Sequence, residues 1–181
     1  MTNGKLMFMK TAALLFLPLM LIATGVAQTR PLSVCDVVKH TGDWDNNVVL
    51  IRAHYYGGME DSFLFDDRCQ GKTIWFDYPE SAAQEDALLK DSLSSKRKTI
   101  ILDKNSNLAA FQHYAGLRVE SNPMCQRMDI EITAVGRIDS KRGIVGKKNC
   151  EPFGMCNYPA RFVLASVREV TASESKQPCR R

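Results

Sequence analysis

Five stretches rich in β-branched and aromatic residues, interrupted once by a helical pattern, constrain the fold of this chain most strongly. They cover residues 48–56, 62–66, 73–78, 128–139 and 161–170. Three strands, a helical insert and two further strands are the element order of an OB-fold, a five-stranded Greek-key barrel. The sequence therefore predicts a mainly β, OB-fold-like domain ordered β-β-β-α-β-β, with an insert at about residues 80–125.

Helical patterns precede the first strand and fill the insert. Ser33 can cap a short helix whose apolar face is made of valines. A capping-box pattern opens a second helix near residues 81–93, and residues 105–115 carry apolar side chains at helical spacing. We therefore expect a single domain, with helices at its start and in its insert.

The first 27 residues have the layout of a secretory signal peptide. Two lysines precede an apolar run over residues 11–23, and small residues at 25–27 suit a cleavage site. A spanning helix needs roughly 20 apolar residues, whereas this run is shorter and contains Pro18. We therefore expect cleavage after residue 27, no stable membrane anchor, and a domain over residues 28–181 that is periplasmic or secreted.

The cysteine content agrees with export. All six cysteines follow the signal peptide: Cys35, Cys69, Cys125, Cys150, Cys156 and Cys179. An even count in an exported chain indicates disulfides, and six cysteines allow 15 pairings. Structural zinc sites usually contain close Cys-x-x-Cys pairs, which this sequence lacks. We expect three disulfides, no metal site and no other cofactor.

Four short motifs near the two ends of the domain are distinctive when they are taken together. They are S-V-C-D at residues 33–36, V-V-L-I-R at 48–52, D-R-C at 67–69 and Y-P-A-R at 158–161. This set resembles a group of exported, uncharacterised bacterial proteins with an OB-fold-like domain. The resemblance thins over residues 80–125, and it implies the fold without implying an activity. These proteins often carry a histidine before the last strand where this chain has Cys156, so a histidine-centred site is not expected.

The disulfide pattern follows partly from this resemblance. Cys35 and Cys69 both occur in the similar proteins, which implies a Cys35–Cys69 bond that ties the first helix to the barrel. Antiparallel pairing of the last two strands favours Cys125 with Cys179, because it brings the two outer strand ends together. Cys150 and Cys156 then remain as a pair inside one loop.

Polar and aromatic residues share the outer face of the first and third predicted strands. By alternation, these residues are Arg52, His54, Tyr56, Trp75 and Asp77. Such a mixture suits an OB-fold binding face, on which aromatic rings stack on bases or sugars and cations pair with backbone charge. In the structural alternative, Trp75 packs under the N-terminal helix or the insert, and Arg52 pairs with Asp77.

A basic segment joins the last two strands. Residues 137–148 contain Arg137, Lys141, Arg142, Lys147 and Lys148 against Asp139 alone, a net charge of +4. Without the signal peptide the chain holds 22 basic and 20 acidic residues, so the rest of the domain is slightly acidic. This OB-fold loop grips polymers in some proteins, which predicts weak, salt-sensitive polyanion binding; the alternative is a solvated loop.

Catalytic motifs are absent from the sequence, which has no G-x-S-x-G, H-E-x-x-H or P-loop. The sequence therefore favours an exported binding module, not an enzyme, with a ligand that the sequence does not identify. The alternative is a secreted, nuclease-like hydrolase, in which Glu60, Asp66 and Asp67 would converge with Arg52 in one cleft. A purely structural or protein-interaction module, without clustered charge, is the third hypothesis.

Overall fold

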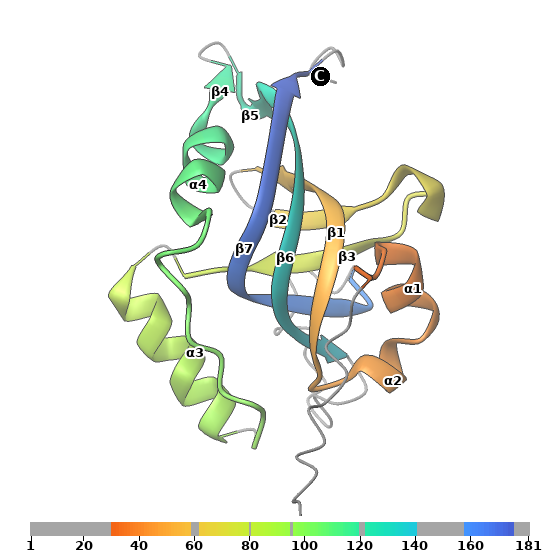
Figure 1. The fold of residues 1–181 in the computed structure, drawn as a ribbon, viewed down its shortest axis with the longest axis vertical. Helices are drawn as coiled ribbons and strands as arrows, with labels where there is room; N and C mark the ends of the chain where they lie inside the picture. Colours follow the sequence, from red (N-terminus) through yellow and green to blue (C-terminus); the bar gives the residue numbers. More distant parts are fainter. Residues whose placement is uncertain are drawn as a thin grey trace, which may run out of the picture.

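A closed barrel of five strands forms the centre of the computed structural model (Figure 1). The strands are β1 (Val48–Gly57), β2 (Ser62–Phe65), β3 (Thr73–Asp77), β6 (Met128–Ser140) and β7 (Ala160–Glu174). β1 pairs antiparallel with β2 and β6, β2 pairs with β3, and β6 pairs with β7. β3 runs parallel to β7 and closes the barrel. The predicted OB-fold-like barrel with a helical insert is confirmed.

The structure describes residues 30–58, 62–79, 81–94, 96–119, 122–140 and 158–175. The predicted signal peptide therefore lies outside the described residues. The same holds for Glu60, Lys141, Arg142, Lys147, Lys148, Cys150, Cys156 and Cys179.

Strict alternation along β1 builds one wall of the core. Val49, Ile51, Ala53 and Tyr55 are at most 5% exposed, as their spacing predicts. Their partners on β6 continue the wall, because Ile132 lies opposite Ala53 and is fully buried. Alternate residues of β1 therefore face the barrel interior, and the residues between them face outward.

Short helices surround the barrel on two sides (Figure 1). They are α1 (Val34–Lys39), α2 (Thr41–Trp44), the 3₁₀ turn η1 (Asp67–Cys69), α3 (Ala82–Ser94) and α4 (Leu108–Gly116). The predicted cap on α1 is present, since the Ser33 hydroxyl accepts a hydrogen bond from the Asp36 N–H at 3.2 Å. Sequence analysis does not predict α2 or the hairpin of β4 (Arg118–Val119) and β5 (Asn122–Gln126), because such short elements show little periodicity.

Helix α4 seals one end of the barrel core. Its buried residues Leu108, Phe111 and Ala115 follow helical spacing, as predicted. The Phe111 ring lies 4.8 Å from the Tyr55 ring and 5.7 Å from the Phe76 ring, both edge-on. Full burial of a phenylalanine side chain contributes about 1.5–3 kcal/mol, so α4 is an integral part of the core.

A buried carboxylate, Asp139 on β6, is shared by three arginines. Its Oδ1 accepts hydrogen bonds from Arg97 at 2.8 Å and from Arg137 at 2.7 Å. Its Oδ2 accepts from Arg137 at 2.9 Å and from Arg161 at 2.8 Å. The Asp139 side chain is completely inaccessible to solvent. Charge-assisted hydrogen bonds of this kind compensate the cost of removing the carboxylate from water.

The arginines of this cluster connect distant parts of the chain. Arg97, which follows α3, also pairs with Asp45 at 3.1 Å. Arg161 on β7 pairs with Asp77 on β3 at 3.3 Å. Arg137 donates to the Ser92 hydroxyl of α3 and to the Lys98 carbonyl. The cluster thus fastens the insert to the outer surface of three barrel strands.

The burial of Arg137 corrects the sequence analysis, which counted it in the basic segment. Its side chain is 0% exposed, because α3 and the residues after it cover this part of β6. The structural alternative for the outer face also proves wrong about Asp77, since Asp77 pairs with Arg161 and Arg52 pairs with Glu131. Two residues of the +4 estimate, Arg137 and Asp139, are therefore buried. Their opposite charges cancel, so the net charge of +4 comes from Lys141, Arg142, Lys147 and Lys148.

We predict that Asp139→Asn lowers the free energy of unfolding by about 3–5 kcal/mol, because it leaves three buried guanidinium groups short of a counter-charge. Chemical denaturation at pH 7 measures this change. As a control, Glu85→Gln removes an ion pair with Lys104 whose lysine side chain is 67% exposed, and should change stability by less than about 1 kcal/mol. Equal denaturation midpoints for wild type and Asp139→Asn would contradict the assigned role.

The difference in free energy of unfolding between wild type and Asp139→Asn should depend on pH in a defined direction. Burial alone would raise the pKa of Asp139, but the hydrogen bonds and charges of Arg137 and Arg161 outweigh it and lower that pKa. A carboxylate with a lowered folded-state pKa stabilises the fold above its unfolded pKa of about 4 and loses this effect as pH falls further. The difference in free energy of unfolding between wild type and Asp139→Asn should therefore be constant from about pH 7 to 5 and become smaller below about pH 4.

Candidate functional site

Aromatic side chains cover the outer surface of β1, β2 and β3. This aromatic face consists of His54, Tyr56, Phe63, Phe65, Trp75 and Tyr158. Strand register sets His54 opposite Phe65, Tyr56 opposite Phe63, and Phe63 opposite Trp75. The first two pairs stack with ring centroids 5.2 Å and 4.8 Å apart. The face is thus a continuous set of cross-strand ring contacts.

The outward direction of His54, Tyr56 and Trp75 agrees with their predicted parity, and all three are half-buried. Trp75 packs edge-on against Tyr158 at 5.4 Å. Sequence reasoning did not assign Phe63 and Phe65 to this face. Alternation places both phenylalanines on the side opposite Leu64, but both sides are apolar in the sequence, and it is the full burial of Leu64 in the structure that shows the phenylalanines facing outward.

A polar groove of about 710 Å³ borders the aromatic face. It is lined by residues 30–33 and 66–68, together with Asp36, Arg52, Ala53, His54 and Glu131. Its walls therefore come from the segment before α1, from the turn at η1 and from the outer side of β1 and β6. His54 belongs to both the groove and the aromatic face, so the two surfaces are continuous.

Two ion pairs fix the charged side chains of the groove. Arg52 donates from Nε and Nη2 to the two carboxylate oxygens of Glu131 at 2.8 Å and 2.9 Å. Arg68 forms the same fork with Asp66 at 2.9 Å and 2.6 Å. Hydrogen bonding by the arginines lowers the pKa of Glu131 and of Asp66, so both carboxylates stay ionised at neutral pH.

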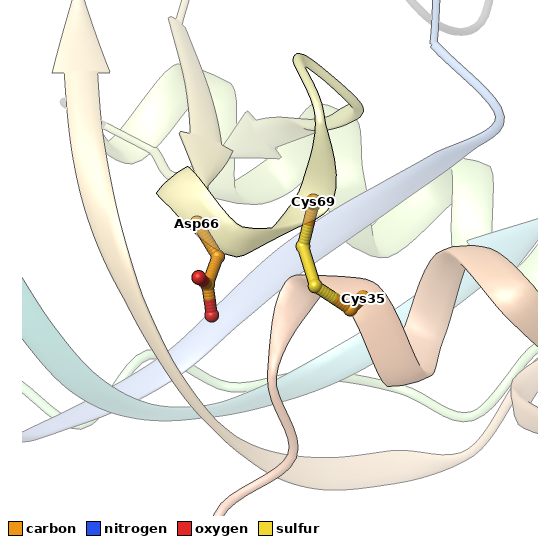
Figure 2. A group of neighbouring side chains, drawn as sticks. All are labelled: Cys35, Asp66 and Cys69. Atoms are coloured by element: carbon orange, nitrogen blue, oxygen red, sulfur yellow. A yellow bond between two sulfur atoms is a disulfide. The ribbon is translucent and has the colours of Figure 1, made fainter.

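A disulfide joins the two sides of the groove. Cys35 in α1 and Cys69 in η1 are bonded, with their Cα atoms 5.2 Å apart. Figure 2 shows Asp66 and Cys69 on the same turn, facing the helix that carries Cys35. This bond confirms the pairing that the resemblance implies. The predicted Cys125–Cys179 and Cys150–Cys156 bonds depend on side chains outside the described residues.

Cys35, Asp66 and Cys69 also place three possible metal-ligand atoms within 4.8 Å of one another (Figure 2). The two sulfur atoms are bonded to each other, and a metal would require them as thiolates. Both oxygens of Asp66 are engaged by Arg68. In the disulfide form, this group therefore braces the groove and does not offer a set of metal ligands.

The groove brings together some of the residues that the hydrolase hypothesis requires. Asp66 and Asp67 line it with Arg52, as that hypothesis expects. Glu60 lies outside the described residues, as do the four basic residues Lys141, Arg142, Lys147 and Lys148. The groove also contains Glu131, which sequence reasoning missed because its proximity to Arg52 depends on the pairing of β1 with β6.

A second, smaller crevice lies beside α3. It has a volume of about 190 Å³ and is lined largely by aliphatic side chains, including Leu88, Leu102 and Leu164. The neighbouring Ile101 is 82% exposed. Its polar lining residues, Glu85, Asp86 and Ser92, all come from α3. Glu85 already pairs with Lys104, and the Ser92 hydroxyl accepts a hydrogen bond from Arg137, so the polar groove is the stronger candidate site.

Comparison of the chain with known protein families, curated proteins and solved structures gives no significant match. Within the residues that the structure describes, no helix combines the length and the apolar character needed to cross a bilayer. The functional argument therefore rests on the geometry of the groove and the aromatic face.

We predict that replacing Cys35 and Cys69 together by serine lowers the free energy of unfolding by about 2–4 kcal/mol, because the bond closes a long loop of the unfolded chain. Denaturation of the double variant, compared with wild type under the same oxidising conditions, measures the loss. Peptide mapping without reductant supplies the control for the pairing. A wild-type map in which Cys35 is joined to any residue other than Cys69 would contradict this connectivity.

Proposed function

We propose that the protein is an exported binding module that holds its ligand on the aromatic face and in the adjoining groove. The observation that carries this proposal is the position of His54, which makes the two surfaces one continuous site. OB-folds use this side of the barrel, built on the second and third strands, to bind oligonucleotides and oligosaccharides. Stacking surfaces next to charged groups suit extended ligands with ring systems.

The ionised, hydrogen-bonded carboxylates of Asp66 and Glu131 favour a binding role over a catalytic one. A general acid or base works best with a pKa near the working pH. The pKa values of Asp66 and Glu131 are instead lowered by their arginine partners. These groups are fixed anions with both oxygens already bonded, so they serve better as hydrogen-bond acceptors for a ligand than as proton carriers.

Export remains part of the proposal. The Cys35–Cys69 bond fits an oxidising compartment, since such bonds are rare in the cytosol. The signal-like first 27 residues and the resemblance to exported bacterial proteins support the same location. We place the protein in the periplasm or outside the cell.

A nuclease-like hydrolase is the second candidate, because the groove gathers Asp66 and Asp67 near Arg52. Metal-assisted hydrolysis needs carboxylates that can bind a cation, whereas Asp66 is held by Arg68. Incubation of single- and double-stranded nucleic acid with the protein and Mg²⁺, Ca²⁺ or Mn²⁺ tests this candidate. Cleavage that is lost in both Asp66→Asn and Asp67→Asn would favour the hydrolase over the binding module.

We predict that a ligand of the proposed site binds at least about tenfold more weakly to Phe63→Ala and to Phe65→Ala, because each change removes a stacking ring. The chain has two tryptophans, Trp44 and Trp75. In a protein that carries Trp44→Phe, the change in tryptophan fluorescence during a ligand titration therefore reports on Trp75, which is part of the aromatic face. Probes are arrays of oligosaccharides and single-stranded oligonucleotides.

Tyr114→Ala is the matched control for these substitutions. Tyr114 is a half-buried aromatic residue of α4 and lies outside the aromatic face and the groove. Its replacement should leave affinity within about twofold of wild type. If Tyr114→Ala weakens the affinity for a ligand as much as the two phenylalanine variants do, the ligand binds elsewhere.

The basic segment gives a separate prediction. Polyanion binding should be weak, and Lys147→Glu with Lys148→Glu should abolish it, because few phosphate contacts are formed and these lysines supply the charge. Titration with a sulfated oligosaccharide at several salt concentrations measures both the affinity and a shallow salt slope. Unchanged binding in the double variant would refute a role for the segment.

A further inference from the structure

We infer that the groove and the aromatic face select an uncharged oligosaccharide over a polyanion. This inference rests on the proposed function, since it names the ligand class of the same site. Three properties carry it: the charge balance of the groove, the exposure of its ion pairs, and the cross-strand rings that continue from it.

The charge balance of the groove disfavours anionic ligands. Its lining contains three arginines, Arg30, Arg52 and Arg68, against four carboxylates, an excess of one negative charge. Arg52 and Arg68 are each neutralised by a two-pronged pair with Glu131 and Asp66. A phosphate or sulfate group entering the groove would have to break such a pair or approach a net negative wall.

The same pairs are well suited to hydroxyl groups. The Arg52 side chain is 60% exposed, and the Arg68 side chain is 78% exposed, so a ligand can reach both guanidinium groups. A guanidinium carries five N–H donors and a carboxylate carries four lone-pair sites, so a fixed pair still presents donors and acceptors side by side. A sugar hydroxyl both donates and accepts, and therefore matches this surface without disturbing the charges.

The aromatic face supplies the apolar half of sugar recognition. His54 and Phe65 stack at the rim of the groove, and Tyr56 and Phe63 form the next stacked pair two residues further along each strand. The C–H face of a pyranose packs on such rings, while its hydroxyl edge needs polar partners. A chain of sugar units can therefore continue from the groove onto the aromatic face.

Single-stranded nucleic acid would also stack on these rings, but it needs cations that follow its backbone. Such grooves combine aromatic platforms with unneutralised positive charge, and their affinity falls steeply with salt. Here the rings lie on the aromatic face, and the adjoining groove carries one excess negative charge among its arginines and carboxylates. The observations therefore favour the uncharged sugar chain.

The experiment uses the purified, oxidised protein with the Trp44→Phe substitution and four probes. These are N-acetylchitotetraose, cellotetraose, a heparin tetrasaccharide and an eight-nucleotide oligothymidine. We expect at least one neutral tetrasaccharide to bind, with affinity that changes less than about twofold between about 50 and 500 mM salt. Phe63→Ala and Phe65→Ala should weaken it at least about tenfold, and Tyr114→Ala should not.

A charge substitution tests the inference without touching the rings. Glu131→Gln leaves Arg52 without its counter-charge in a solvent-exposed pair, so the fold should tolerate it. It should raise the affinity for the heparin tetrasaccharide at least about threefold. Because Glu131 also offers acceptor oxygens to sugar hydroxyls, the neutral tetrasaccharide should bind Glu131→Gln no more tightly than wild type, so the preference of the site should shift toward heparin. Near-ultraviolet circular dichroism and the Cys35–Cys69 link in peptide maps verify that each variant is folded.

Different results would overturn the sugar inference alone or the proposed site as well. If only the oligonucleotide or the heparin fragment binds, with a steep salt dependence and loss in the phenylalanine variants, the sugar inference is overturned and the proposed site stands. If neither neutral tetrasaccharide binds, the sugar inference is likewise overturned. If ligands bind but the phenylalanine variants match wild type for every probe, both the inference and the proposed site fall.

Discussion

The buried carboxylate of Asp139 is the interaction on which the assembly of the domain depends. A lone carboxylate at this depth would be strongly destabilising, but five hydrogen bonds from Arg97, Arg137 and Arg161 compensate its loss of water. Because these arginines also bond Asp45, Asp77 and Ser92, the same charge positions the insert, α2 and β3 against β6 and β7. The barrel and its covering helices are therefore stabilised as one unit.

The other side of the barrel uses charges differently. Around the groove, the ion pairs of Arg52 and Arg68 are exposed, and a covalent bond between Cys35 and Cys69 supplies the rigidity. Exposed pairs contribute little to stability, so their arrangement is available for recognition. The molecule thus separates a buried network that holds the fold from an exposed one that a ligand can reach.

Local patterns predicted the elements and the direction of many side chains. The alternation from Val49 to Tyr55 identified both faces of β1, and Ser33 identified the start of α1. The same reasoning failed for Arg137, since a strand pattern does not show that another element covers its outer face. It also missed Phe63 and Phe65 as members of the aromatic face, because alternation does not show which side of β2 faces the core and the burial of Leu64 does.

Local patterns are enough to predict the order of the strands along the chain, the inward residues of β1 and, through resemblance, the Cys35–Cys69 bond. These depend on short-range periodicity and on recognisable motifs. Three-dimensional packing was needed to see that Glu131 and Asp66 neutralise Arg52 and Arg68 in the groove and that Asp139 is buried among three arginines. Residues 52 and 131 are 79 positions apart, and their contact is fixed by the register of β1 against β6. Such partners arise from barrel closure and packing, whose register the local sequence pattern does not specify.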